Sequence, residues 1–158
     1  FYRLKQEKMA ATFTYYERQA QPVLPRLAAH LRAIGLTPDL FFVDQMYTIF
    51  SRSLPLECAC RVWDLFLRDG NEFIFRASLG ILAMFEDVLL GLEFVDAAQF
   101  LSRLPEELDT EKLFATIATI KLVPPRLWQP PDGALPFQTE KGAASEASIS
   151  LVKKLFQF

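Results

Sequence analysis

Residues 53–76 read Ser53-Leu-Pro-Leu-Glu-Cys-Ala-Cys-Arg-Val-Trp-Asp-Leu-Phe-Leu-Arg-Asp-Gly70, followed by Asn71-Glu-Phe-Ile-Phe-Arg76. Pro55 suits the first turn of a helix, where a missing N–H costs nothing, and Gly70 is typical of the position just past a helix end. Between them the apolar residues recur at three- and four-residue steps, which predicts a helix with one buried face. That face is expected to consist of Leu56, Ala59, Cys60, Trp63, Phe66 and Leu67.

The polar residues of this helix form a second stripe, which consists of Glu57, Arg61, Asp64 and Arg68. Their charges alternate, so each neighbouring pair is expected to form an intrahelical ion pair worth about 0.2–0.5 kcal/mol. The spacing alone favours a solvated face, because exposed ion pairs are common and weak. The alternative is that Arg61 and Asp64 orient neighbouring loops or contact a partner. Trp63 lies on the apolar side and is expected to anchor the core.

The sequence before this helix is also helical in pattern. Pro22 and Pro25 are expected to interrupt an opening amphipathic helix and to start a short second one, which Gly35 ends. The pair Thr37-Pro38 predicts the next helix start, with the Thr37 hydroxyl as its cap. Each of these signals depends only on neighbouring residues. It predicts where a helix begins or ends, but not which helices are in contact.

The sequence after Gly70 continues with helices. Residues 71–92 are apolar nearly all round, which predicts one long helix inside the molecule. Two shorter helices are expected near residues 95–103 and 110–120. No stretch alternates with a period of two for long enough to form a sheet, so the prediction is an all-α fold, an irregular array of helices over residues 1–121.

Residues 122–158 differ in composition. Prolines crowd residues 124–136, which is incompatible with a regular helix and predicts an irregular segment. Ile149, Val152, Leu155 and Phe156 return to helical spacing and predict a short docked helix near the end. The expected organisation is therefore a helical part over residues 1–121 and a Pro-rich part over residues 122–158.

Composition and charge exclude several classes of function. A net charge of −2 over 158 residues gives no reason to expect a nucleic-acid partner. The uncharged run 77–85 is far too short to span a bilayer. Cys58 and Cys60 point to different faces of a helix, so neither a disulfide between them nor a metal site is expected. The glycines form no phosphate-binding motif, and His30 lacks the partners of a catalytic triad.

Several segments together resemble one protein family. Besides residues 53–76, they are Leu36-Thr-Pro-Asp39, Phe42-Val-Asp44, Tyr47 to Leu56, Gly80-Ile-Leu82, Phe85 to Leu90, Phe100 to Pro105 and Glu111-Lys-Leu-Phe114. The combination resembles the C-terminal half of the TBC domain, the helical domain of Rab GTPase-activating proteins. It is similar in particular to the branch linked to recycling endosomes and autophagy. The resemblance covers about residues 1–121.

The resemblance implies acceleration of GTP hydrolysis on a bound Rab protein, in vesicle trafficking. Family members supply an arginine finger, worth about 10³–10⁵ in rate, and a glutamine that positions water. The two lie in Ile-x-x-Asp-x-x-Arg and Tyr-x-Gln motifs, which this sequence lacks. Catalytic residues are therefore expected upstream of Phe1, in a missing N-terminal half, and this part is expected to be inactive alone.

Two groups of residues have expected roles. The residues expected to face a partner or to support the site are Arg61, Asp64 and Asp44, and those of the structural signature are Pro55, Trp63, Gly70, Phe75 and Arg76. No cofactor is expected, since GTP and Mg²⁺ belong to the Rab partner. A cytoplasmic protein, peripheral at endosomal or other vesicle membranes, is the expected setting. The competing interpretations are a non-catalytic helical module that binds a Rab GTPase or adaptor, and an unrelated helical scaffold.

Overall fold

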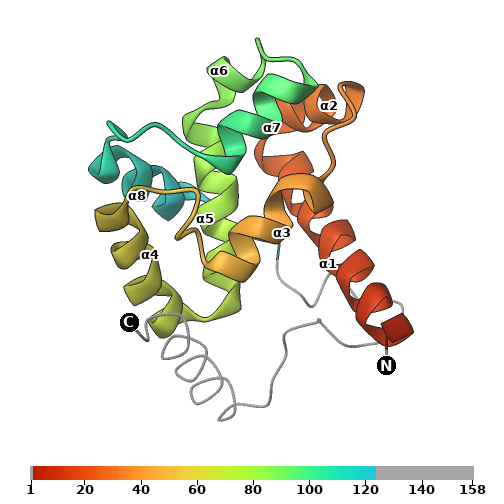
Figure 1. Cartoon of the computed structure of the whole chain (residues 1–158), viewed down its shortest axis with the longest axis horizontal. Helices are drawn as coiled ribbons and strands as arrows, with labels where there is room; N and C mark the ends of the chain where they lie inside the picture. The colour runs from red at the N-terminus through yellow and green to blue at the C-terminus, as the bar shows by residue number, and fades with distance from the viewer. Residues whose placement is uncertain (1, 124–158) are drawn as a thin grey trace.

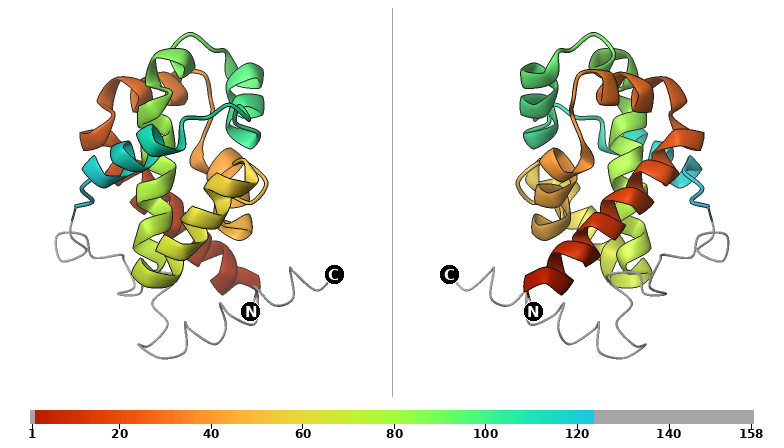
Figure 2. Two further views of the ribbon diagram at one scale, coloured as in Figure 1. Left: turned by 90° about the vertical axis from the view of Figure 1, so that its left-hand side faces the viewer. Right: turned by 90° about the vertical axis from the view of Figure 1, so that its right-hand side faces the viewer.

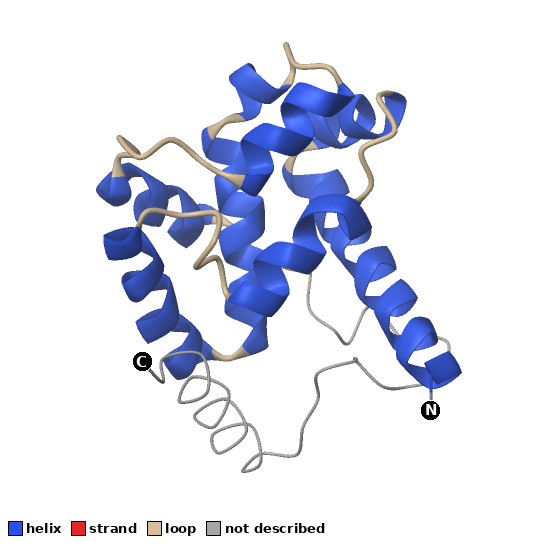
Figure 3. Ribbon diagram, in the orientation of Figure 1, coloured by secondary structure: helices blue, strands red, loops and turns tan. Residues whose placement is uncertain are grey.

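All regular structure in residues 2–123 is helical, in agreement with the predicted all-α class (Figures 1 and 3). The computed structural model describes the backbone of residues 2–123 and the side chains of residues 9–123. The helices are α1 (Tyr2–Val23), α2 (Pro25–Ala33), α3 (Pro38–Thr48), α4 (Leu56–Asp69), α5 (Asn71–Met84), α6 (Glu86–Leu89), α7 (Phe94–Ser102) and α8 (Thr110–Thr119).

Helix α5 is the centre of the array. Helices α1, α3, α4 and α8 all pack against it, and the two side views show them on different sides of α5 (Figure 2). Its buried residues are Phe73, Ile74, Phe75, Ala77, Ser78, Leu79, Gly80, Ile81 and Leu82. A helix buried on nearly every side needs apolar residues all round, as the sequence predicts.

The predicted extent of this helix is wrong. Residues 71–92 form two helices, because α5 ends at Met84 and Phe85 leaves helical geometry at φ −109° and ψ 19°. The Phe85 ring packs edge-to-face on Phe100 of α7, with 5.0 Å between ring centroids. This contact lies across the turn of the chain and cannot be read from the periodicity of either segment.

Gly80 allows α8 to approach α5 closely. A Cβ atom built on Gly80 would lie 2.4 Å from Cγ1 of Ile117, so any larger residue would push the helices apart. Ile117 is buried in this contact at 2% exposure. The close packing makes α8 the cover of one side of α5.

Two predicted helix boundaries need correction, and two others are confirmed. Pro22 does not interrupt α1, which runs on to Val23; the proline costs one hydrogen bond within the last turn but its fixed φ suits the helix. The Thr37 hydroxyl caps nothing, although Pro38 does begin α3. Pro25 begins α2, and Gly35 follows that helix in the left-handed region at φ 78°.

A buried polar chain joins three of the helices. The Tyr16 hydroxyl on α1 lies 2.8 Å from Ser78 Oγ on α5, and Ser78 Oγ donates to Gln45 Oε1 on α3 at 2.7 Å. All three side chains are at 1% exposure. An unpaired polar group here would cost about 1–3 kcal/mol. These hydrogen bonds therefore favour one relative placement of α1, α3 and α5.

The described part of the chain ends beside α1. The backbone N–H of Val123 donates to Gln19 Oε1 at 2.7 Å, and Gln19 Nε2 donates to the Val123 carbonyl at 3.3 Å. The predicted irregular segment beyond residue 123 and the predicted helix around Ile149–Phe156 lie outside the described residues. None of the helices in residues 2–123 is both long enough and apolar enough to cross a membrane.

Candidate functional site

Helix α4 buries a face that is rotated from the predicted one. Its buried residues are Cys58, Ala59, Val62, Trp63 and Phe66. Leu56 and Leu67, both expected in the core, are 75% and 53% exposed, and Cys60 is also exposed. Apolar residues make up more than half of this helix, so their spacing alone does not determine which of them lies at the centre of the buried face. Packing against α5 centres burial on Val62.

Arg61 takes its partners from α8 rather than from its own helix. Its Nη1 atom donates to Glu111 Oε1, and its guanidinium carbon lies 4.3 Å from the centre of the Phe114 ring. A guanidinium over an aromatic face gains about 0.5–1 kcal/mol at an exposed site. The predicted intrahelical pairs of Arg61 with Glu57 and Asp64 are therefore wrong. Because α8 lies beside α4 on α5 (Figure 1), it offers Arg61 both a carboxylate and a ring.

The other members of the polar stripe do not form a ladder either. Arg68 donates from Nε to Asp69 Oδ1 at 2.6 Å and from Nη2 to Asp69 Oδ2 at 2.7 Å, a pairing with its sequence neighbour. These hydrogen bonds from Arg68 lower the pKa of Asp69. Asp64 is exposed, and no ion pair among residues 9–123 includes it.

The turn between α3 and α4 is strained. Ile49 and Phe50 have φ values of 47° and 61°, in the left-handed region that costs roughly 1–2 kcal/mol for each non-glycine residue. Both side chains are buried, and Trp63 Nε1 donates to the Ile49 carbonyl at 2.9 Å. Trp63 is 9% exposed, which places it in the core as predicted. Burial and this hydrogen bond offset the strain and fix the direction of the chain.

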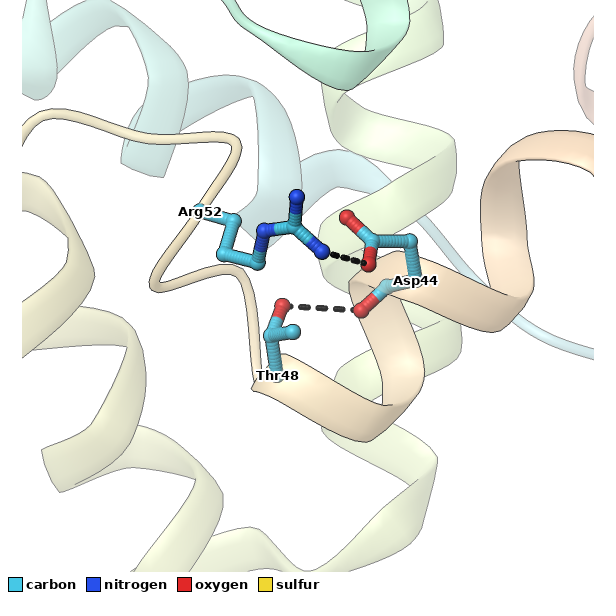
Figure 4. A network of polar contacts seen from close by, with 3 residues as sticks. All are labelled: Asp44, Thr48 and Arg52. Carbon is cyan, nitrogen blue, oxygen red and sulfur yellow. Dashed lines mark hydrogen bonds and ion pairs between the residues drawn. The ribbon is translucent and has the colours of Figure 1, made fainter. Parts of the chain in front are cut away.

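This turn brings Arg52 back onto α3. Figure 4 shows the Arg52 guanidinium beside Asp44, with Nη1 at 3.0 Å from Asp44 Oδ1. Thr48 Oγ1 donates to the Asp44 backbone carbonyl at 2.8 Å. The Arg52 side chain is 73% exposed and the Asp44 side chain 38% exposed. The pair is a surface feature whose two ends are placed by the buried turn.

The residues of the signature have structural positions. Pro55 precedes α4, and Gly70 follows it at φ 75°. The Phe75 ring packs edge-to-face on Tyr15 with centroids 5.0 Å apart, and Arg76 Nη2 lies 3.5 Å from the carbonyl of Ile117. Each of these residues thus joins or bounds helices around α5.

Two polar clusters lie on the described surface. We define the α4–α8 cluster as Arg61, Glu111 and Phe114, and the α3 cluster as Asp44, Thr48 and Arg52. Arg61 and Asp44 belong to different clusters, and no hydrogen bond or ion pair joins them. Sequence reasoning missed the roles of Glu111, Phe114 and Arg52. The charge of Arg52 eight residues after Asp44 was the available signal, but only the turn makes them neighbours.

These clusters suit binding better than proton transfer or nucleophilic attack. Cys58 is 1% exposed, and burial raises its pKa to about 11, so its thiol is inert at neutral pH. His30 Nε2 lies 3.0 Å from the Leu92 carbonyl and links α2 to the segment before α7. Within residues 9–123, no group of three or more His, Cys, Asp or Glu side chains could hold a metal ion. Exposed guanidinium and carboxylate groups can instead exchange their present partners for those of another protein.

Comparison with known proteins identifies the family. The sequence profile of the Rab-GTPase-TBC domain matches residues 1–90. Over 122 residues, 77% of this chain, the chain is 49% identical to human "TBC1 domain family member 14" and 48% identical to "TBC1 domain family member 12" of Xenopus tropicalis. Over 123 residues it is 31% identical to "Drainin" of Dictyostelium discoideum.

The matches cover a small part of these relatives. The chain spans 18% of the length of the two TBC1 relatives and 28% of that of Drainin. The profile match includes helices α1 to α6 and therefore the α3 cluster and Arg61. Together with the all-helical fold and the signature positions around α4, the match shows that the chain belongs to the Rab-GTPase-TBC domain family.

Proposed function

We propose that this chain is the supporting part of a GTPase-activating protein for Rab-family small GTPases. The observation that carries the proposal is the match to the Rab-GTPase-TBC domain over residues 1–90. Neither finger motif of the family occurs in the sequence, and we assign the arginine and glutamine that act on GTP to the missing N-terminal half of the same domain. In this proposal the chain is inactive alone, and GTP and Mg²⁺ belong to the Rab partner.

We further propose that the exposed charges on α3 and α4 face the Rab protein or support the finger residues. No ion pair within residues 9–123 includes Asp64, and Asp44 and Arg61 take part in ion pairs at the surface. Surface ion pairs are worth about 0–1 kcal/mol, so exchanging them for partner contacts costs little. The proposed setting is the cytoplasmic side of endosomal or other vesicle membranes, as a peripheral protein. Similarity to TBC1 domain family members 12 and 14 supports the same branch.

The second candidate function is a non-catalytic module that binds a Rab GTPase or an adaptor. The sequence feature that favours it is the lack of both finger motifs. Where the module binds a Rab GTPase, the two functions share a binding partner and differ in whether GTP hydrolysis is accelerated. A binding measurement alone therefore cannot separate them.

Single-turnover GTP hydrolysis on a panel of Rab proteins tests the proposal. The chain is compared with a longer protein in which a TBC segment carrying both finger motifs precedes residue 1. We expect acceleration only with the longer protein, by about 10³–10⁵ on its target. Rab binding without acceleration by the longer protein would establish the non-catalytic module. Acceleration by the 158-residue chain alone would refute the assignment of the finger residues to another segment.

Substitutions in the longer protein test the proposed partner-facing residues. We expect Asp44→Ala and Arg61→Ala to lower the rate of hydrolysis on the Rab target by roughly tenfold each, the effect of losing about 1.4 kcal/mol of transition-state binding. Arg103→Ala is the matched control, because Arg103 forms an exposed ion pair with Glu106 outside both clusters. Losses of activity that only follow losses of stability would assign Asp44 and Arg61 a purely structural role.

A further inference from the structure

The exposed side of α4 carries an apolar stripe. Its members Leu56, Cys60 and Leu67 are spaced by four and seven residues, which places them on one side of the helix. Leu56 is 75% exposed, the highest value of any large apolar side chain in residues 9–123, and Leu67 is 53% exposed. In Figure 1, α4 lies at the left-hand edge of the array, with α5 on its inner side. Apolar side chains that gather on one exposed surface are typical of protein–protein contacts.

A stripe of charged residues runs beside the apolar stripe. Its charges alternate along the helix from negative to positive, over Glu57, Arg61, Asp64 and Arg68. All four residues are exposed. Arg61 has five N–H donors, and its hydrogen bond to Glu111 takes one of them. Surface ion pairs are weak, so the arginines can turn to the carboxylates of another molecule at little cost.

The order of these charges is self-complementary for two antiparallel copies of α4. The outer pair, Glu57 and Arg68, and the inner pair, Arg61 and Asp64, have the same midpoint in the sequence, between positions 62 and 63. A two-fold axis at that midpoint places each glutamate or aspartate opposite an arginine of the second copy. Such a contact requires this relation, because residue i meets residue j and residue j meets residue i. A parallel pairing in register would instead place like charges opposite each other.

The same axis brings the apolar stripes together. A two-fold axis that lies between two antiparallel helices keeps each stripe on its own side of the contact, so charge meets charge and apolar meets apolar. Leu56 and Leu67 have their midpoint one residue earlier, between positions 61 and 62. Leu56 therefore lies within about 3 Å, along the helix direction, of Leu67 in the second copy. Burial of the leucines supplies the attraction, and the charges fix the direction of pairing.

We propose that the exposed side of α4 is a self-association site, at which two copies of the chain pair antiparallel about a two-fold axis. A contact made by one helix from each copy is smaller than a standard protein interface, so the pairing is weak and depends on protein concentration. Because the pair covers Arg61 and Asp64, a second copy and any other protein that binds these residues exclude one another. This association stands apart from the proposed function, since it needs no Rab protein.

Charge reversal tests the pairing in the full 158-residue chain, with sedimentation velocity as the measurement. Glu57→Arg leaves both outer charges positive, and Arg68→Glu leaves both negative. We expect each variant alone to dimerise with a Kd about tenfold higher than that of the parent chain, because like charges then meet. An equimolar mixture of the two variants should recover the parent Kd, because the two chains complement each other.

The matched controls lie in an exposed ion pair outside α4. Arg103→Glu and Glu106→Arg make the same charge changes there and should leave the Kd unchanged. All four substituted side chains are exposed, and circular dichroism checks that each variant keeps the helical content of the parent. The proposal is overturned if the parent chain stays monomeric up to about 0.5 mM. It is also overturned if the mixture of the two α4 variants dimerises no better than either variant alone.

Cys60 supplies a second readout without any added residue. The proposed axis places the two Cys60 side chains about 7 Å apart along the helix direction, on the apolar side of the contact. Cys58 is buried and does not compete for a thiol reagent. We expect a short bis-maleimide to yield a covalent dimer that Cys60→Ser abolishes and that Glu57→Arg reduces about tenfold at equal concentration. Cross-linking that is indifferent to Glu57→Arg would place the contact on another surface and overturn the proposal.

Discussion

The buried and exposed sides of α4 each carry a cysteine but have different physical roles. Cys58 is 1% exposed and faces the core, whereas Cys60, two residues later, is exposed. On the buried side Trp63 holds the carbonyl of the strained residue Ile49. On the exposed side Arg61 holds Glu111 on α8, and Asp64 is unpaired among the described side chains. The buried side thus maintains the fold, and the exposed side contributes little to it.

The difference teaches where change is tolerated. A buried polar group that loses its partner costs about 1–3 kcal/mol, whereas an exposed ion pair is worth about 0–1 kcal/mol. A family signature that includes both sides therefore combines residues that are needed for folding with residues that folding does not require. Stability measurements can separate the two groups.

Trp63→Ala should have the largest effect on stability, because it disrupts the packing of the buried side of α4. It removes a core indole and the hydrogen bond to Ile49, so we expect the free energy of unfolding to fall by about 3–5 kcal/mol. Urea unfolding followed by circular dichroism measures the change. Trp63→Phe keeps most of the ring but not the N–H, and should cost less. An alanine variant within 1 kcal/mol of the parent would show that Trp63 does not hold the turn.

Raising the pH should lower the free energy of unfolding, because Cys58 on the buried side of α4 loses its proton more readily in the unfolded state. Burial raises its pKa from the ordinary 9.0 to about 11, so the folded state holds the proton more tightly. This contribution is complete below pH 9 and is lost as the pH rises from 9 towards 11. Between pH 8 and pH 10 we expect a loss of roughly 1 kcal/mol. Urea unfolding at both pH values measures it, and Cys58→Ala should reduce the loss where Cys60→Ala does not.

Arg61→Ala should have a moderate effect, since it removes two of the contacts between α4 and α8. The ion pair with Glu111 and the stacking on Phe114 together predict a loss of about 1 kcal/mol. A double-mutant cycle with Glu111→Ala separates the ion pair from the stacking. If the cycle shows no coupling, the ion pair contributes nothing to stability, and the loss is due to the stacking of Arg61 on Phe114.

Asp64→Ala should have the smallest effect on stability. It is therefore the clearest test of the difference between the buried and exposed sides of α4. Its carboxylate is exposed and forms no ion pair within residues 9–123, so we expect the free energy of unfolding to change by less than about 0.5 kcal/mol. The same thermal or urea measurement applies, with Asp44→Ala as the companion variant from the α3 cluster. A loss above 1 kcal/mol would mean that Asp64 supports the fold directly.

Much of the candidate site could be predicted because its placement is local. The ends of α4 follow from Pro55 and Gly70, and the core position of Trp63 follows from the apolar repeat. The partner of Arg61 could not be predicted, because Glu111 lies 50 residues away and α8 reaches Arg61 only through its packing on α5. Within the sequence of α4, only Glu57 and Asp64 are spaced to form an ion pair with Arg61.

The sequence by itself determined the all-helical class, the start of α2 at Pro25 and the glycine positions that follow α2 and α4, because these depend on backbone preferences of neighbouring residues. Tertiary structure decided which side of α4 is buried. It also placed Arg52 beside Asp44, through a turn in which Ile49 and Phe50 adopt conformations that their side chains disfavour. The burial of residues that are distant in sequence offsets the free-energy cost of these backbone conformations. Contacts between distant residues cannot be predicted from the spacing of apolar residues within one segment.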